Sequence, residues 1–204
     1  MKSYTNTLCL IKKMKYEYQK ACKCGNVDSI EVTRKEAAFG LKEKEIWSQE
    51  CSKCGNKEFT SLSHPQPEFK TDLLIEWGNN ADYFFMEQDE DLMLADEKYI
   101  DLILEVLDNH QILSQKRNVL IEALCVIIYD NNVSDENNAD LTDRVAKELK
   151  KRKTDVLNAQ DWIMDYIKEV SFPIIGIEYV SKKTNSSEHK EKNNIWNKLK
   201  QIWN

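Results

Sequence analysis

Hydrophobic and polar residues predict short strands in the first third of the chain. Residues 28–33 alternate between apolar and polar side chains, the period of a β-strand with one buried face. Residues 15–20 and 58–62 are short segments of the same strand-forming character, and we interpret residues 45–50 as part of the same region. The N-terminal part is therefore expected to form a small β-structure.

Beyond residue 66 the apolar residues follow a helical period. Pro65 and Pro67 make the preceding segment stiff and non-helical, which places a domain boundary there. Residues 73–77 are compatible with either a strand or a helical turn. Four helices are predicted over residues 92–107, 114–129, 140–153 and from 154 or 155 to 172. The helix at 114–129 is apolar nearly all round, so we expect it to be central.

The expected fold class is α+β. Residues 1–66 form a small N-terminal β domain, and residues 67–180 form an all-α domain of four or five helices, packed as a bundle or like helical repeats. Residues 181–204 are expected to be a polar linker followed by a short amphipathic helix that carries Trp196 and Trp203.

Composition favours helices and an intracellular setting. The 204 residues are 41% hydrophobic and 31% charged, with only 3 Pro and 5 Gly. The chain opens on polar residues without an apolar leader, and no stretch approaches the roughly 18 apolar residues of a membrane helix. We therefore expect a cytoplasmic protein with no membrane span.

Charge is distributed unevenly along the chain. Residues 1–66 carry 12 basic and 8 acidic side chains, a net of +4, whereas residues 67–180 carry 11 and 25, a net of −14. Residues 181–204 carry 6 and 2, a net of +4. An acidic middle repels phosphates, which argues against nucleic acid as the main partner.

Four of the six cysteines form two closely spaced pairs. Cys22 and Cys24 make the first pair, Cys51 and Cys54 make the second, and each pair is followed at once by a glycine. Tetrahedral zinc is held well by four thiolates on two tight turns, in which glycine tolerates the positive φ required. The 26 residues between the pairs are enough for a hairpin that returns one turn to the other. We predict one structural Zn²⁺ bound by these four cysteines.

This pattern resembles the zinc-ribbon family over residues 16–60. In this family each cysteine pair and the glycine after it form a tight turn, called a knuckle, with two residues between the cysteines. The second knuckle, at Cys51 and Cys54, has these two residues, whereas the first, at Cys22 and Cys24, has one. Cys9 or His64 could replace one ligand. Because four sulfur ligands leave no open position for water, a structural ion is expected rather than a catalytic one. Cys125 lies in the most apolar helix and is expected to be a small buried hydrophobic residue.

An acidic run occupies residues 82–108, with ten acidic residues and one basic residue. Such charges repel one another unless a cation or a basic partner compensates them, and the run lacks the glycine and final glutamate of a calcium loop. We expect it to contact a basic protein partner. The predicted contact residues are Glu87, Asp89, Glu90, Asp91, Asp96, Glu97 and Asp101.

Residues 117–130, together with the acidic helix before them, resemble the small acidic helical immunity proteins of bacterial toxin systems. The resemblance covers about 70 residues and has no diagnostic motif. It implies a cytosolic antitoxin whose acidic surface neutralises a basic toxin domain, with charge complementarity speeding association.

Two other function classes compete with this one. A zinc-ribbon adaptor associated with nucleic acid is favoured by five lysines near the N-terminus with tyrosines between them, namely Lys12, Lys13, Lys15, Lys20 and Lys23. An enzyme is disfavoured because the three histidines are scattered and no phosphate loop or catalytic triad is recognisable. We therefore predict a non-enzymatic protein.

Overall fold

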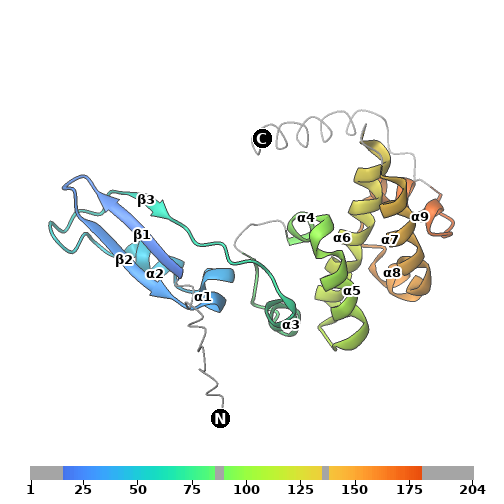
Figure 1. Cartoon of the computed structure of the whole chain (residues 1–204), viewed down its shortest axis with the longest axis horizontal. Helices are drawn as coiled ribbons and strands as arrows, with labels where there is room; N and C mark the ends of the chain where they lie inside the picture. The colour runs from blue at the N-terminus through green and yellow to red at the C-terminus, as the bar shows by residue number, and fades with distance from the viewer. Residues whose placement is uncertain (1–15, 86–89, 135–137, 181–204) are drawn as a thin grey trace, which may run out of the picture. The chain divides into compact units, whose positions relative to one another are not determined.

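The computed structural model describes residues 16–85, 90–134 and 138–180. Within these residues three antiparallel strands precede a series of helices, which confirms the α+β class (Figure 1). The chain divides into two compact units between Leu120 and Ile121. The linker and C-terminal helix predicted for residues 181–204 lie outside the described residues.

The three strands pair as an antiparallel sheet in the order β2-β1-β3. They are β1 (Tyr16–Cys22), β2 (Val27–Val32) and β3 (Phe59–Ser63), close to the predicted segments. The register between β1 and β3 shifts between Gln19 and Lys20. We call residues 16–63, which contain this sheet, the cysteine module.

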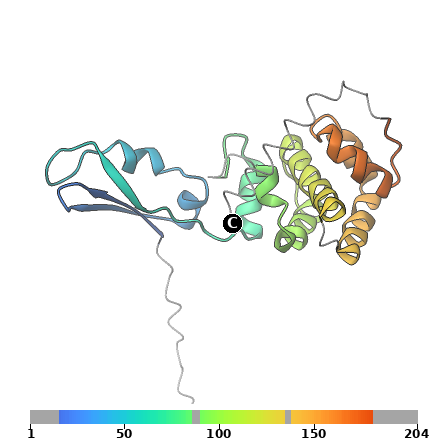
Figure 2. The same cartoon turned by 90° about the horizontal axis from the view of Figure 1, so that it is seen from above.

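One face of the sheet is covered by a short helix, as Figure 2 shows. Successive side chains of a strand point to opposite faces, so Tyr18, Lys20 and Cys22, which are two positions apart in β1, lie on the same face. All three are buried. Tyr18 forms a small hydrophobic core with Val32 and, from the covering segment, Ala37 and Ile46.

Residues 45–50 are not a strand, which corrects the sequence interpretation. They lie largely in α2 (Glu43–Ser48), which follows α1 (Arg34–Ala38). Short apolar runs do not distinguish strand from helix by periodicity alone. The helix instead pairs residues one turn apart, since Trp47 Nε1 donates to Glu43 Oε1 at 3.1 Å.

A capping box starts α1. The Thr33 side chain accepts from the Glu36 amide at 3.2 Å, and the Glu36 carboxylate accepts from the Thr33 amide at 2.9 Å. This reciprocal pair satisfies two helix N-terminal amides, and its spacing is visible in the sequence. It also lowers the pKa of Glu36, chiefly through the hydrogen bond from the Thr33 amide.

The ambiguous residues 73–77 are helical and belong to α3 (Thr71–Asn79). Leu74 and Trp77 are completely buried. The loop after α5 approaches this helix closely, since the Leu113 amide donates to the Gly78 carbonyl at 2.8 Å. A Cβ at Gly78 would lie 2.6 Å from Ile112 Cγ2, so the approach requires glycine.

Contacts within the first unit join the cysteine module to α3, across the domain boundary that we predicted at residue 66. Arg34 Nη1 lies 2.9 Å from Asp72 Oδ2, and Lys35 pairs with Glu76. Phe39 stacks on Tyr83 with ring centroids 4.7 Å apart. The boundary itself stays a prediction.

The helix predicted over residues 92–107 is broken, which is a second correction. It consists of α4 (Glu90–Leu94), the 3₁₀ helix η1 (Glu97–Tyr99) and α5 (Ile100–Asn109). Asp96 causes the break, because its carboxylate accepts from the Lys98 amide at 3.0 Å and its backbone is extended. Aspartate often caps a new turn in this way instead of continuing a helix.

The apolar segment predicted to be central forms α6 (Ser114–Val133), in which residues 120–128 are all buried. It runs past the predicted end at residue 129. The added turn includes Asn131 and Asn132, whose side chains donate to the Ile127 and Ile128 carbonyls at 3.0 and 2.8 Å. The next helix, α7 (Ala139–Lys151), begins one residue earlier and ends two residues earlier than the predicted range of 140–153.

The last predicted helix is two helices, α8 (Lys153–Ala159) and α9 (Asp165–Ile174), which is a third correction. Pro173 lies inside the final turn of α9 rather than after it. Gly176, with φ +74°, follows the C-cap Ile175, and the Ile177 amide donates back to the Phe172 carbonyl at 2.9 Å. This is the hydrogen bond of a Schellman motif.

Among the helices of the described residues, none has the length and hydropathy that crossing a bilayer requires.

Candidate metal centre

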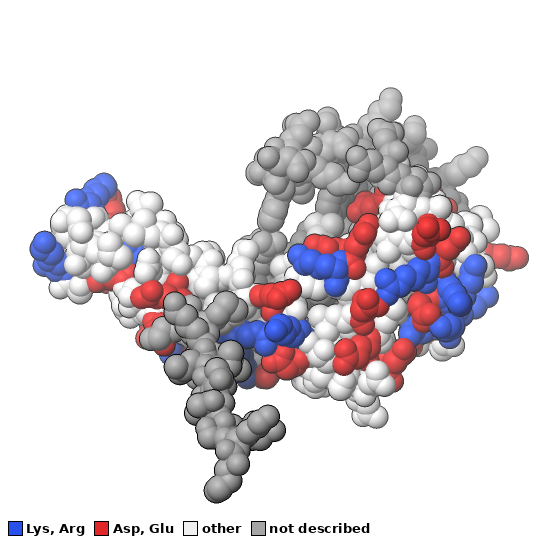
Figure 3. All heavy atoms as spheres, viewed as in Figure 1, with Lys and Arg blue, Asp and Glu red and all other residues white. Residues whose placement is uncertain are grey.

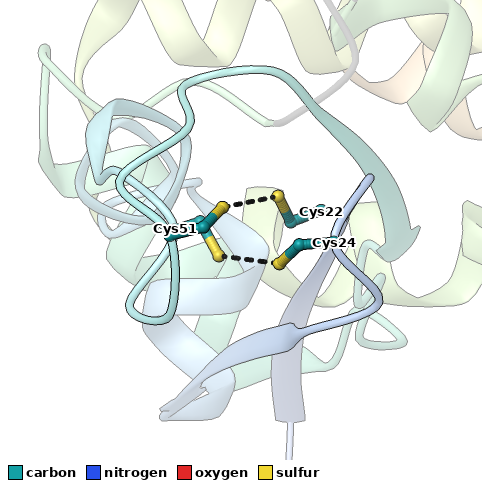
Figure 4. A group of neighbouring side chains, drawn as sticks. Cys22, Cys24 and Cys51 are labelled. Atoms are coloured by element: carbon teal, nitrogen blue, oxygen red, sulfur yellow. Dashed lines mark hydrogen bonds between the residues drawn. The ribbon is translucent and has the colours of Figure 1, made fainter.

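The two predicted cysteine pairs come together at one end of the sheet. Cys22 ends β1 and Cys24 follows in the turn, while Cys51 and Cys54 lie in the loop between α2 and β3. Their sulfur atoms all lie within 4.8 Å of one another. Cys22 Sγ lies 3.5 Å from Cys54 Sγ, and Cys24 Sγ lies 3.7 Å from Cys51 Sγ. In Figure 4 the sulfurs of Cys22 and Cys24 point toward the knuckle that contains Cys51. This arrangement can bind one metal ion.

Both turns close through a glycine with positive φ. Gly25 has φ +82° and donates to the Cys22 carbonyl at 2.9 Å, and Gly55 has φ +70° and donates to the Cys51 carbonyl at 2.9 Å. Residues with a Cβ rarely adopt this conformation. The glycine role predicted from the sequence therefore applies to both knuckles.

The first knuckle has the same closing hydrogen bonds as the second although it is one residue shorter. The Cys22 amide donates to the Asn26 carbonyl at 2.9 Å, and the Cys51 amide donates to the Asn56 carbonyl at 2.8 Å. The shorter spacing thus leaves the turn intact.

Burial differs within each pair. Cys22 and Cys51 are 7% and 5% exposed, whereas Cys24 and Cys54 are exposed. The centre therefore lies at the surface with two sulfurs facing the interior. Figure 3 shows Lys and Arg side chains at this end of the sheet. Two lysines close in sequence to the knuckles, Lys23 and Lys57, have side chains that are 76% and 79% exposed and pair with glutamates.

The thiols are electrostatically unequal. Burial opposes ionisation of Cys51, but the backbone N–H groups of Lys53 and Cys54 outweigh it and lower the pKa of Cys51 to about 6. The Asn56 amide favours the Cys54 thiolate, yet the adjacent sulfurs of the other cysteines raise the pKa of Cys54 to about 12. The backbone N–H groups around Cys51 therefore favour its thiolate, which is the form in which cysteine binds metal.

A buried lysine holds the segment that leads into the second knuckle. Lys20 is 2% exposed, and its Nζ donates to the carbonyls of Ile46, at 2.7 Å, and of Gln49. The same Nζ lies 4.8 Å from the centroid of the Phe59 ring. These contacts anchor the end of α2 and the following residue, Gln49, which is two residues before Cys51.

Three polar side chains, which the sequence analysis missed, join the knuckles. Asn26 Nδ2 donates to Asp28 Oδ1 at 2.9 Å and to Ser52 Oγ at 3.0 Å, and it lies 3.7 Å from Cys51 Sγ. The Ser52 hydroxyl and amide both donate to the Asp28 carboxylate. The hydrogen bond from this hydroxyl lowers the pKa of Asp28. The repeated Cys-Gly-Asn in both knuckles is the sequence signal that could have drawn attention to Asn26.

The alternative ligands do not join the cluster in the described residues. The ring of His64 packs against Tyr18 and Trp47, with centroids 5.5 and 6.2 Å away, and its Nε2 lies 3.6 Å from Glu43 Oε1. Cys9 lies outside the described residues.

Cys125 is fully buried in α6, as its apolar sequence surroundings predicted. Burial raises the pKa of its thiol to about 12. A neutral thiol with no solvent access is chemically inert.

Glu90, one of the predicted partner contacts, instead makes contacts within the first unit. Its side chain is 13% exposed, and Oε1 lies 3.1 Å from Lys116 Nζ and accepts from Trp77 Nε1 at 2.9 Å. Lys116 Nζ also donates to the Tyr83 carbonyl at 2.6 Å and lies 4.4 Å from the Trp77 ring centroid. The structure therefore gives Glu90 an intramolecular role.

The other predicted contact residues have different surroundings. Asp96 pairs with Lys98 at 2.8 Å, and Asp91 is half-buried. Glu87 and Asp89 lie outside the described residues.

The remaining predicted contacts, Glu97 and Asp101, are exposed and share one helix face with Glu105 and Asp108. These four residues, the acidic stripe, lie three or four positions apart, the spacing that aligns side chains along a helix. Over the helices, the face seen in Figure 3 carries acidic side chains interspersed with basic ones.

Comparison with protein-family models, curated proteins and solved structures finds no match for this chain. The four clustered cysteines beside a small antiparallel sheet are compatible with a zinc ribbon.

Proposed function

We propose that the cysteine module holds one structural Zn²⁺ and that the chain is a non-enzymatic binding protein. The four-sulfur cluster carries this proposal. Sulfurs within 4.8 Å of one another can close around a tetrahedral ion with Zn–S bonds of about 2.3 Å after a small adjustment. Four thiolates complete the coordination shell, so the ion would join the two knuckles and leave no position for water or substrate.

Metal analysis of the purified full chain tests the metal. We expect about one zinc per chain and four thiols that react with a thiol reagent only after chelation, since bound thiolates are protected. Absence of zinc, with these thiols freely reactive in the folded protein, would contradict the proposal.

For the partner, we propose a basic protein, specifically a bacterial toxin domain that the chain neutralises as an immunity protein. The acidic stripe supports this because its four side chains are exposed on one face of η1 and α5. The opposite face of α5 buries Ile100, Ile103 and Val106. A line of like charges outside a packed helix attracts an oppositely charged surface and accelerates association.

Neutralising the stripe should weaken this binding. The triple variant Glu97→Gln, Asp101→Asn, Glu105→Gln loses three charges, and we expect at least roughly tenfold weaker binding, mostly through slower association at low salt. The bait is the full chain, used for affinity capture from the organism that encodes it. A basic protein encoded beside this gene should be retained and its binding measured.

The matched control is Asp143→Asn, Asp161→Asn, Glu178→Gln, which removes three exposed acidic charges elsewhere. It should bind nearly as well as the unmodified chain. If both triple variants lost the same affinity, the weaker binding would reflect the net charge of the chain and not the position of the acidic stripe. Capture of RNA or ribosomal proteins in place of a basic toxin domain would contradict the immunity function and favour a nucleic-acid adaptor.

A further inference from the structure

We propose that Asn26, Asp28 and Ser52 form a clamp that positions the two knuckles before the metal binds and so sets how tightly the ion is held. This inference rests on the proposed zinc binding. The clamp joins residues 24 positions apart, because Ser52 donates through both its amide, at 3.2 Å, and its hydroxyl to Asp28.

The clamp is fixed at one end to the sheet. Asp28 lies in β2 and faces Lys20 of β1 in the antiparallel register. At the other end, Ser52 directly follows the ligand Cys51. A hydrogen bond from the Ser52 amide to a strand residue therefore restrains the backbone next to a sulfur ligand. Such restraint reduces the ordering that metal binding would otherwise require.

Asn26 connects the clamp to the metal ligand itself. Its Nδ2 lies 3.7 Å from Cys51 Sγ, across from its own knuckle. An N–H group directed at a thiolate stabilises the negative charge on sulfur. The corresponding Asn56 has a local contact instead, since its Oδ1 accepts from the Glu58 amide at 3.2 Å. Asn26 thus acts between the knuckles, whereas the Asn56 contact stays within the second one.

The clamp residues lie outside the hydrophobic core of the cysteine module, so they can be changed without altering its packing. Ser52 is exposed and Asn26 is half-buried, and both lie apart from the hydrophobic cluster that includes Tyr18 and Ile46. Removing the Ser52 hydroxyl therefore leaves the packed interior unchanged. Its main consequence should be at the metal, where the loss of an outer hydrogen bond typically costs ten- to a hundredfold in affinity.

The test compares Ser52→Ala and Asp28→Asn with the unmodified full chain. Zinc affinity is measured by competition with a chromophoric chelator, and the release rate by transfer to EDTA. We expect affinity to fall by about tenfold or more in both variants. With Co²⁺ in place of zinc, the visible absorption should keep the intensity of a four-thiolate site, because all four ligands remain. The absorption bands should shift in wavelength.

Two further variants serve as controls. Glu58→Gln removes an exposed carboxylate of the same module that pairs with Lys23 and not with the clamp, and it should bind zinc like the unmodified chain. Ser52→Thr retains the hydroxyl and should restore most of the affinity that Ser52→Ala loses.

The outcomes separate the two proposals. If the unmodified chain binds no zinc, the proposed metal function fails. If it binds one zinc while Ser52→Ala and Asp28→Asn match Glu58→Gln, only the clamp is overturned. Equal loss in Ser52→Thr and Ser52→Ala would also overturn it. So would a fall in unfolding temperature that is the same with and without zinc, with unchanged affinity, since that would indicate a purely structural role.

Discussion

Cys51→Ser is expected to abolish the proposed zinc binding and unfold the cysteine module. Cys51 is buried and contributes one of the four clustered sulfurs, and serine is a poor zinc ligand. An ion present at about 1,000 times its Kd stabilises the state that binds it by about 4 kcal/mol. The small core around Tyr18 and Ile46 has little to replace that contribution. Zinc content and hydrogen exchange of the β1–β3 amides measure the result.

The matched control is Cys125→Ala, which removes a thiol outside the cluster and should retain one zinc. Chelation of the unmodified chain should reproduce the loss of protection in the sheet. Protected β1–β3 amides in zinc-free Cys51→Ser would show that the module does not need the ion.

Lys116→Met is expected to lower the free energy of unfolding by about 3–5 kcal/mol. Methionine fills similar space but leaves the Glu90 carboxylate, whose side chain is only 13% exposed, without its cation. The Tyr83 carbonyl also loses a donor, and the contact with the Trp77 ring loses its charge. Denaturant titration followed by tryptophan fluorescence and circular dichroism measures the change.

Lys98→Met is the matched control, because Lys98 likewise pairs with a carboxylate and lies over an aromatic ring, but its side chain is 60% exposed. Its loss should cost only about 0–1 kcal/mol. Adding Glu90→Gln to Lys116→Met should recover part of the stability, since it removes the unpaired charge while an amide oxygen can still accept from Trp77. Equal effects of Lys116→Met and Lys98→Met would refute the buried-pair interpretation.

The cysteine cluster could be predicted because a knuckle is a local structure. A short cysteine spacing followed by Gly25 or Gly55 defines the turn almost completely. The strands next to the knuckles could be predicted for a similar reason, since alternation over a few residues is enough to indicate a half-buried strand.

The helix α2 could not be distinguished from a strand in the same way. Its apolar residues Ile46 and Trp47 are adjacent in sequence, and their contacts with Tyr18 come from a different element. At this position tertiary contacts, and not the local sequence pattern, favoured a helix over a strand. The break at Asp96 is different, because an aspartate before a short polar segment was a local signal that the helical period of the neighbouring apolar residues concealed.

The acidic run shows what residue counting leaves out. Glu90 and Asp101 carry the same charge, but only the fold separates a carboxylate that is largely buried beside Lys116 from one that is exposed. The clamp was missed for the same reason, because Asp28 and Ser52 are far apart in the chain and neither is unusual by itself.

The glycine in α3 has a consequence for protein engineering. Consensus or propensity-based design would replace Gly78 with alanine, which is favoured in helices by about 1 kcal/mol. The added methyl group would meet the β-branched Ile112 at 2.6 Å, and a stiff side chain cannot easily move aside. Stabilisation campaigns on this chain should therefore leave position 78 unchanged and direct helix-favouring substitutions to exposed positions.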